Sequence, residues 1–343
     1  MNLAYETFLQ QSEEWRSRVL GAICFSAGEY RIPESNTLPC LHVSMRSLGR
    51  SDTICELWHS AAVLEEGQHE NIRYRCNDEM LFGVIELPET DFTGTMPLQE
   101  ATESAYRQIG TLLDKLNYSY VMRFWNYMAD INAETCQLER YRQFNIGRQA
   151  GMEMRNPNLK SNVPPACALG TASGKLCIAF LAGRTAPIAI ENPRQMSAYA
   201  YPPVYGPRSP SFSRAGLVML EGQEWLFISG TASIVGHASV HIGDVAAQTR
   251  ETLTNIGAVL EQANQQVRQG RFHLSGLQYK IYLRRCGDLE IVRAEFDAIT
   301  GGAEAVYLQA DICRQELLIE IEAAAAAGSI SPQSKIAHVC ESS

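Results

Sequence analysis

The order of strand-like and helix-like segments in the last third of the chain is the feature that most restricts its fold. Hydrophobic periodicity there switches between helical and strand spacing, with turn signals such as Glu221-Gly222 between segments. The predicted elements are a hairpin, a long amphipathic helix, a strand, a second helix and two closing strands, over residues 216–234, 244–267, 275–285, 287–300, 305–312 and 316–324. This order predicts an α+β unit in which a mixed β-sheet packs against two helices.

The middle of the chain contains a partial copy of the same plan. A helix predicted over 98–118 is followed by a strand rich in aromatic and β-branched residues over 119–131. A further helix is predicted over 136–155, whereas residues 1 to about 95 hold short strand-like segments with weak periodicity. The repeated helix and strand indicate an internal duplication.

Two features separate these copies. Segments 166–172 and 175–184 are joined by Ser173-Gly174, a sequence typical of a hairpin, so we expect them to be adjacent strands. Residues 191–215 contain five prolines and four aromatic residues without any regular period, which favours a functional loop. The predicted division is an N-terminal domain, an active-site loop, a C-terminal domain and a tail: 1–190, 191–215, 216–325 and 326–343.

Composition and charge exclude several classes of partner. The formal net charge of −9 argues against nucleic acid, whose binding needs concentrated Lys and Arg. No apolar run approaches the roughly 20 residues that cross a bilayer, and the first residues lack the basic start of a signal peptide. We therefore expect a cytoplasmic protein that binds neither nucleic acid nor membrane.

Several motifs that would indicate a bound group are missing from the sequence. The ten cysteines are scattered and form no CxxC pair, so we expect neither disulfides nor a zinc site. His237 and His241 lie four apart in a strand-like or turn-like segment with no third ligand, and no glycine-rich phosphate loop occurs. Arginines nevertheless cluster in two islands suited to a small anion: Arg140, Arg142, Arg148 and Arg155, then Arg184, Arg194, Arg208 and Arg214.

Longer blocks carry a family resemblance. Residues 243–263, the YLRR strand and the last strand together resemble the RidA/YjgF family. The blocks RFWNYMADIN, YRQFNIGR, 190–215, LFISGTASIVGHASVHIGDV and DICRQELLIEIE are more specific, and in this order they resemble the chorismatase family over residues 123–322. This resemblance implies two RidA/YjgF-like (chorismate mutase-like) domains with a pseudo-symmetric cleft between them. It also implies chorismate as substrate and no metal or organic cofactor, with the choice between monomer and homo-oligomer open.

The resemblance also implies which residues bind the two carboxylates of chorismate. Arg148 and Arg214 are the expected clamps, since a guanidinium pairs with a carboxylate through two parallel hydrogen bonds. Tyr201 is expected to add a phenolic hydrogen bond. Tyr205 and Arg208 are further candidates on the same loop, although Pro207 alone would explain that segment as a rigid surface turn.

Glu320 is the expected general acid, by its match to the family position. Alternation along the last strand would place Leu318, Glu320 and Glu322 on one face. A glutamate in a water-poor cleft keeps its proton, so Glu320 is expected to protonate the enolpyruvyl methylene. Glu322 is expected to be a solvated edge charge.

Gly230 and Cys313 point to one of two reaction branches, because relatives that make a diene diol have alanine at both positions. The resemblance therefore favours 3-hydroxybenzoate and pyruvate as products, with glycine leaving room for the ring and the thiol assisting proton transfer. Hydrolysis to 3,4-dihydroxycyclohexa-1,5-diene carboxylate and pyruvate is the alternative, and Cys313 can equally be a small buried apolar residue. Imine hydrolysis and a non-catalytic module that binds an aromatic acid also remain open.

Overall fold

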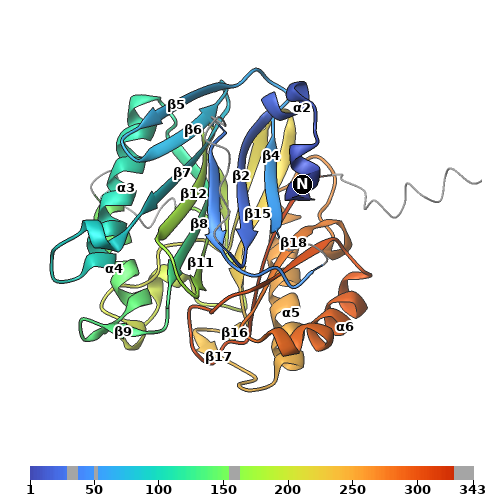
Figure 1. The fold of residues 1–343 in the computed structure, drawn as a ribbon. Coiled ribbons are helices and arrows are strands. Elements are labelled where there is room, and N and C mark those ends of the chain that lie inside the picture. Colours follow the sequence, from blue (N-terminus) through green and yellow to red (C-terminus); the bar gives the residue numbers. More distant parts are fainter. Residues whose placement is uncertain (29–37, 50–52, 154–162, 328–343) are drawn as a thin grey trace, which may run out of the picture.

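A computed structural model of the protein describes residues 1–28, 38–49, 53–153 and 163–327. Three main sheets stand side by side around a common core, with helices on the two outer flanks (Figure 1). Two of these sheets have six strands each, and the third, built from N-terminal residues, has four.

The first unit is a six-stranded sheet of order β11-β8-β12-β7-β6-β5, covered on one face by two helices. Its helices are α3 (Pro97–Lys115) and α4 (Arg140–Glu153). Its strands are β5 (Glu65–His69), β6 (Ile72–Cys76), β7 (Met80–Leu87), β8 (Tyr120–Ala129), β11 (Ala166–Thr171) and β12 (Leu176–Gly183).

The second unit is a six-stranded sheet of order β13-β14-β15-β20-β18-β19, also covered by two helices. Its helices are α5 (Val245–Ala263) and α6 (Leu289–Thr300), close to their predicted positions. Its strands are β13 (Ile188–Ile190), β14 (Ala215–Leu220), β15 (Gln223–Thr231), β18 (Gln278–Leu283), β19 (Ala305–Gln309) and β20 (Ile319–Ala326).

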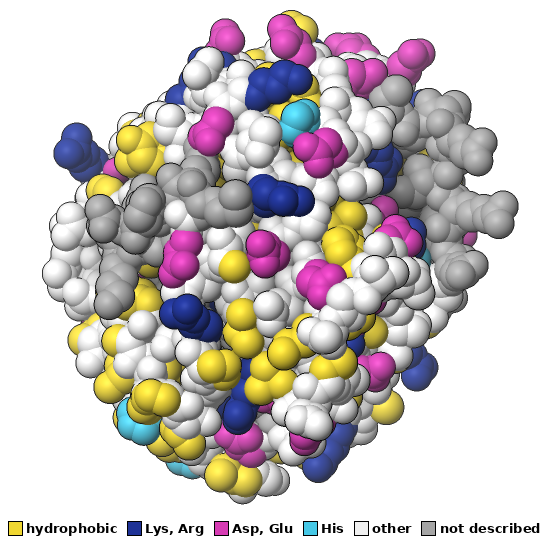
Figure 2. All heavy atoms as spheres, turned by 90° about the vertical axis from the view of Figure 1, so that its left-hand side faces the viewer, with side chains coloured by type: hydrophobic (Ala, Val, Ile, Leu, Met, Phe, Trp, Pro, Cys, Tyr) yellow, Lys and Arg dark blue, Asp and Glu magenta, His cyan; other side chains and the backbone are white. Residues whose placement is uncertain are grey.

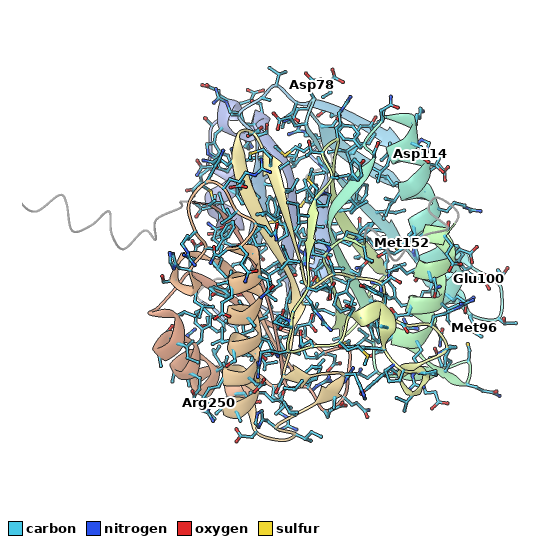
Figure 3. The ribbon with its side chains drawn as sticks, turned by 180° about the vertical axis from the view of Figure 1, so that it is seen from behind. Asp78, Met96, Glu100, Asp114, Met152 and Arg250 are labelled. Carbon is cyan, nitrogen blue, oxygen red and sulfur yellow. A yellow bond between two sulfur atoms is a disulfide. The ribbon has the colours of Figure 1, made fainter. Side chains whose placement is uncertain are left out.

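The two units share one topology, which confirms the internal duplication and the α+β class. Taken in chain order, the strands correspond one to one, from β5 with β13 to β12 with β20. Each sheet has a single parallel pair, β8 with β11 and β18 with β19, and its other neighbours are antiparallel. The helix pairs lie on opposite flanks: Figure 3 shows α3 with Glu100 and Asp114 on one side, and Arg250 of α5 on the other.

The N-terminal residues form the third sheet and several small elements. Strands β1 (Asn2–Ala4), β2 (Val19–Ser26), β3 (Cys40–Ser44) and β4 (Thr53–His59) have the order β1-β4-β2-β3, with helices α1 (Tyr5–Leu9) and α2 (Glu13–Ser17) between β1 and β2. Two short hairpins complete the structure: β9 (Glu134–Thr135) with β10 (Leu138–Glu139), and β16 (Ile234–Val235) with β17 (Ala238–Ser239).

One apolar core joins all three sheets. Each six-stranded sheet turns one face to its own helices and the other face to this shared core. Phe25 comes from the N-terminal sheet, Phe82 and Trp125 from the first unit, and Phe227 and Tyr282 from the second. Because every sheet buries a face against the others, the N-terminal sheet is part of the same folded body.

The predicted hairpin over residues 166–184 is wrong. Strand β8 lies between β11 and β12, and β11 runs parallel to β8. The reason is that β8 is apolar on both faces: Phe124 and Met128 pack toward α3 and α4, and Trp125 and Tyr127 toward the shared core. A strand buried on both faces is most stable in the middle of a sheet, and this outweighs the local turn signal.

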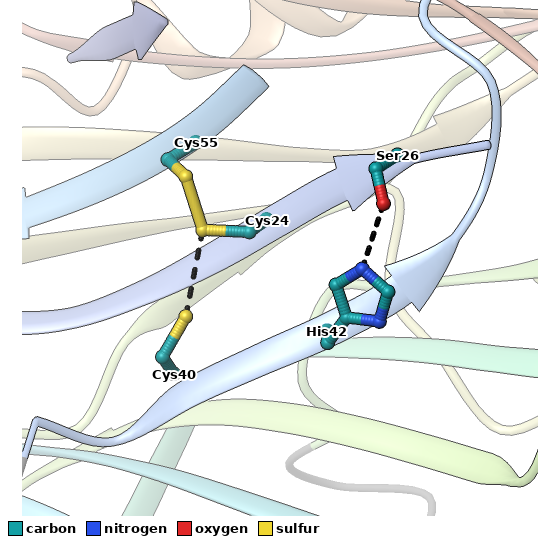
Figure 4. Close-up of a disulfide and its surroundings, with 5 residues drawn as sticks. All are labelled: Cys24, Ser26, Cys40, His42 and Cys55. Atoms are coloured by element: carbon teal, nitrogen blue, oxygen red, sulfur yellow. Dashed lines mark hydrogen bonds between the residues drawn. A yellow bond between two sulfur atoms is a disulfide. The ribbon is translucent and has the colours of Figure 1, made fainter. Parts of the chain in front are cut away.

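The expectation of no disulfide is also wrong. Cys24 on β2 and Cys55 on β4 are direct partners in the antiparallel register, with Cα atoms 4.1 Å apart, and their sulfurs are bonded (Figure 4). Cys40 on β3 donates its thiol to the Cys24 sulfur at 3.4 Å. The bonded cysteines are 31 positions apart in the sequence, so their proximity is visible only once the strands are paired.

One face of the molecular surface shows how the charged side chains are distributed. On the flank formed by α3 and α4, acidic and basic side chains are interspersed, and hydrophobic side chains gather in the lower half (Figure 2). No helix within the described part of the chain has the length and apolar character needed to span a bilayer. Arg155 and residues 328–343, most of the predicted tail, lie outside the described residues.

The predicted domain boundary at residue 190 stays a prediction. Strand β13, which precedes that boundary, pairs with β14 and so belongs to the sheet of the second unit. Residues 191–214 connect β13 to β14 and contain two short 3-10 turns, Ala198–Ala200 and Pro203–Tyr205.

Candidate active site

Six of the eight predicted site residues line one cavity of about 310 Å³, here called the active-site cavity. Its wall combines the first turn of α4 and the residue before it in the first unit, the 191–215 loop, the end of β15, the β19–β20 connection and β20. It is therefore built from both units, as the predicted cleft requires. The six residues are Tyr201, Tyr205, Arg214, Gly230, Cys313 and Glu320.

Glu320 lies on β20, a strand that pairs with β15 on one side and β18 on the other. Its side chain is only 4% exposed. The pKa of Glu320 is raised to about 8, mainly by burial and also by the nearby Glu322 carboxylate, while Arg123 opposes the shift. A carboxylic acid with this pKa keeps its proton near pH 7 and can donate it to a substrate.

Leu318 does not share the Glu320 face as predicted, because β20 begins only at Ile319. Leu318, Ile319 and Ile321 all pack into the core beneath α5 and α6. Strict alternation applies within a strand, and the residue before the strand is free to turn either way.

Glu322 is buried rather than a solvated edge charge, so that expectation is wrong. β20 is an internal strand, and Glu322 is paired with Arg123 and with Lys280, whose Nζ lies 2.5 Å from Glu322 Oε1. The Tyr282 hydroxyl also donates to Glu322, at 2.9 Å. Burial alone would raise the pKa of Glu322, but Lys280 and Arg123 lower it to about 2. The two carboxyl groups on this face of β20 therefore differ in charge near pH 7.

Gly230 lies where the β15–β20 pairing is irregular, between Ile228 and Thr231. A Cβ atom at residue 230 would lie 1.9 Å from Glu320 Oε1 and 3.2 Å from Cys167 Cβ. The Glu320 carboxyl therefore occupies the space that an alanine methyl group would need. The Glu320 carboxyl can therefore take its observed position only when residue 230 has no side chain.

Arg214 and Tyr201 meet inside the active-site cavity. Arg214 Nη2 donates to the Tyr201 hydroxyl at 2.9 Å and to the Met196 carbonyl at 2.7 Å. Arg214 is buried, and its Nε has no hydrogen-bond partner among the described residues. A buried guanidinium with a free donor is suited to bind an anionic ligand.

Arg314 also lines this cavity, and the sequence reasoning missed it. Its guanidinium lies 4.0 Å from the centre of the Tyr205 ring and 5.3 Å from that of Tyr201. Nη1 donates to the His237 carbonyl at 2.9 Å, whereas buried Nη2 has no partner among the described residues. The only sequence signal was its position directly after Cys313 in the DICRQELLIEIE block.

Arg148 and Arg208 do not line the cavity. Arg148 is fully buried, stacks on Phe144 with its guanidinium 5.2 Å from the ring centre, and donates to Asn145 at 3.1 Å. Arg148 is also near Tyr141, which does line the cavity. Burial strongly raises the pKa of Tyr141, and the charge of Arg148 lowers it. Arg208 is exposed on the loop surface.

Cys313 lies in the cavity with a neutral thiol. The pKa of Cys313 is raised to about 12, mainly by burial and also by the proximity of Glu320, while Arg314 opposes the shift. The residue is partly exposed and lines the cavity, and it also packs against the shared core and against the core of the first unit.

A buried acid between two duplicated α+β units defines a two-unit enzyme whose candidate site lies between its halves. Residues 56–182 match the family model described as chorismatase FkbO/Hyg5-like, N-terminal. A 3-hydroxybenzoate synthase of Streptomyces hygroscopicus is 35% identical over 282 residues, which cover 79% of this chain and 81% of that protein. A chorismatase of Streptomyces rapamycinicus is 34% identical over 293 residues, covering 82% and 86% of the two chains.

A solved structure agrees with these relatives. The crystal structure of a chorismatase, 32% identical, matches with a TM-score of 0.84 over 95% of this chain and 97% of that chain. The chain therefore belongs to the chorismatase family, and it is an enzyme.

Proposed function

We propose that the protein cleaves the enolpyruvyl ether of chorismate and releases pyruvate and 3-hydroxybenzoate. The observation that carries this proposal is a protonated, buried Glu320 in the same cavity as two arginines with free donors, Arg214 and Arg314. Chorismate is a dianion, so it needs two cationic partners as well as an acid. A substrate with a single carboxylate, such as a small imino acid, would leave one of the two guanidinium groups unpaired.

In the proposed reaction, Glu320 gives its proton to the methylene carbon of the enolpyruvyl group. The carbon that bears the ether oxygen becomes an oxocarbenium ion, which the ring hydroxyl captures. Two bonds then break: the bond from the ring to the hydroxyl oxygen, and the bond from the side-chain carbon to the original ether oxygen. Pyruvate therefore leaves with the hydroxyl oxygen, and the ether oxygen stays on the ring as the phenol. The hydroxyl proton and one ring C–H proton are released as the ring becomes aromatic, and the phenol oxygen and Glu320 take up one proton each. The sum of the products equals chorismate, so this branch consumes no water and Glu320 can recover its proton.

The hydrolytic alternative consumes one water and leaves a diene diol. Two features support the aromatic branch: glycine rather than alanine at residue 230, where the Glu320 carboxyl occupies the place of the missing methyl group, and the likeness to a relative named 3-hydroxybenzoate synthase. The neutral thiol of Cys313 is placed beside the acid, where it can donate or relay a proton during aromatisation.

Product analysis tests this proposal directly. Purified protein incubated with chorismate should yield pyruvate and 3-hydroxybenzoate in equal amounts, identified by chromatography and mass spectrometry. Pyruvate with the diene diol would retain the family reaction and reject the aromatic branch. If the folded protein releases no pyruvate, both the aromatic and the hydrolytic reaction are rejected.

Glu320→Gln tests the role of the acid. The amide cannot donate the proton, so turnover should fall by about 10²–10⁴-fold, while chorismate binding measured by calorimetry persists. Glu261→Gln on the exposed surface of α5 is the matched control and should retain turnover. Substantial turnover by Glu320→Gln would exclude Glu320 as the essential acid.

A further inference from the structure

A second cavity, of about 480 Å³, lies where the three sheets meet, and the proposed reaction does not use it. We call it the tryptophan cavity because Trp58 of β4, Trp125 of β8 and Trp225 of β15 all line it. Glu322 of β20 lines this cavity and Glu320 lines the active-site cavity. The two cavities thus lie along one face of the same strand.

The aromatic residues of the tryptophan cavity form a continuous cluster. The Trp58 ring centre lies 5.6 Å from that of Trp125, 6.0 Å from that of Trp225 and 5.6 Å from that of Phe227. Aromatic faces and edges at such positions accept another planar ring in stacked or edge-on contact. The size of the cavity is within the range of small-molecule sites.

Two buried donors of this cavity have no hydrogen-bond partner among the described residues: Arg123 Nη1 and Trp58 Nε1. Arg123 is 2% exposed, and its guanidinium lies 5.5 Å from the centre of the Trp125 ring. A buried donor without an acceptor costs about 1–3 kcal/mol, which an acceptor oxygen on a ligand would recover. A carboxylate offers two such oxygens, one for each donor.

The charges around the tryptophan cavity limit how much charge a ligand can bring. Two cationic side chains, Arg123 and Lys280, stand against three carboxylates, Glu56, Glu221 and Glu322. Lys280 is already paired with Glu56 and Glu322, and Glu221 accepts hydrogen bonds from neighbours that include Ser60. Because carboxylates outnumber the cationic side chains, a dianion would meet more repulsion from the glutamates than a ligand with a single carboxylate.

We propose that the tryptophan cavity is a second binding site, for a small aromatic monocarboxylate whose ring contacts the tryptophans and whose carboxylate meets Arg123 and Trp58. This site is separate from the one that the proposed function uses. Its occupancy does not depend on which reaction the enzyme catalyses.

Tryptophan fluorescence reports on this cavity selectively. The chain has four tryptophans, of which three line the tryptophan cavity, and none lines the active-site cavity. Benzoate should therefore cause a saturable change in tryptophan emission of the full-length protein. Acetate, which has the carboxylate without the ring, should cause none.

Variants assign that signal to one cavity. Ala324→Leu fills the tryptophan cavity without changing its charges and should abolish the response to benzoate. Arg214→Gln, in the active-site cavity, should retain it. Trp58→Phe keeps a ring but loses the donor, and should weaken binding about tenfold as measured through the remaining tryptophans.

Three outcomes would overturn the proposal: no saturable response by the wild-type protein, a response that survives in folded Ala324→Leu, or one that disappears in Arg214→Gln. If Ala324→Leu does not fold, unchanged benzoate affinity in Trp58→Phe would overturn it instead. Product analysis with chorismate is independent of all these measurements, so failure of this proposal and failure of the proposed function are distinguishable.

Discussion

Glu320 is the proposed proton donor, and its surroundings disfavour the charged form of its carboxyl group. The energetic reason is burial next to the fixed negative charge of Glu322, and both factors favour the neutral acid. If proton donation by Glu320 controls turnover, kcat should be constant at lower pH and fall as pH rises through about 8. A pH profile of kcat checks this. A fall near the ordinary pKa of a glutamic acid would contradict the proposed state of Glu320.

The same residue makes stability depend on pH. The folded protein holds a proton that the unfolded chain releases, because the folded pKa of Glu320 is about 8 and its ordinary value is 4.5. Its contribution to stability is complete below pH 4.5 and is lost as pH rises toward 8. Glu320→Gln should remove this part of the dependence, which urea unfolding at several pH values would measure. An unchanged dependence in the variant would contradict the assignment.

Gly230→Ala should change both rate and product. The added methyl group cannot coexist with the observed place of the Glu320 carboxyl, so the acid must rotate away and the cavity becomes narrower. We expect a fall in turnover of about tenfold or more, and a smaller share of 3-hydroxybenzoate among the ring products. Gly257→Ala on α5 is the matched control, since nothing lies within 4 Å of the new methyl group. An unchanged product ratio would remove Gly230 from the choice between branches.

At the scale of single elements, β20 carries two carboxyl groups with opposite protonation states. Glu322→Gln would leave Arg123 and Lys280 without their shared carboxylate, which should cost about 3–5 kcal/mol of stability. It should also lower the pKa of Glu320 and move the alkaline fall of kcat to lower pH. Urea unfolding and the pH profile measure these two effects separately.

A double variant tests whether the loss of stability in Glu322→Gln comes from the unpaired guanidinium of Arg123. Adding Arg123→Met to Glu322→Gln removes the unpaired guanidinium and should recover part of the lost stability. An alkaline limb that does not move in Glu322→Gln would show that Glu322 has no influence on the acid.

The sequence was sufficient for the elements whose periodicity and turn chemistry agree. The hairpin at Glu221-Gly222 is confirmed, since both residues have positive φ angles, 45° and 77°, and β14 pairs with β15. The hairpin at Ser173-Gly174 failed because a distant strand, β8, inserts between the two segments. Strand pairing over long sequence distances leaves no local signal, and the disulfide between Cys24 and Cys55 was missed for the same reason.

In the candidate site, too, some residues could be predicted from the sequence and others became visible only in the folded structure. Family blocks placed Glu320, Gly230 and Arg214, which the structure brings into one cavity. They did not reveal Arg314, because its free donor becomes visible only when the 191–215 loop folds over it and Tyr205 stacks on its guanidinium. Burial of Glu322 was equally hidden, since its partners Arg123 and Lys280 come from two other strands.

At the scale of the whole molecule, the N-terminal sheet is required by the units that follow it. A chain that begins at residue 61 would lack Phe25, Leu41 and Val43 and would expose the apolar faces that they cover. We expect this shortened protein to lose cooperative thermal unfolding and to bind the dye ANS, as loosely packed states do. Calorimetry and ANS fluorescence check this. A single cooperative transition without dye binding would mean that the two units fold without the first sheet.

The shared core also has a consequence for synthesis on the ribosome. Leu41 and Leu308 belong to the same core but are 267 positions apart in the chain. At typical translation rates the early residue waits roughly a quarter of a minute to a minute before the late one exists. During that time the nascent N-terminal sheet has an apolar face with nothing to cover it, so yield should depend on the speed of translation and on the chaperones that hold the growing chain.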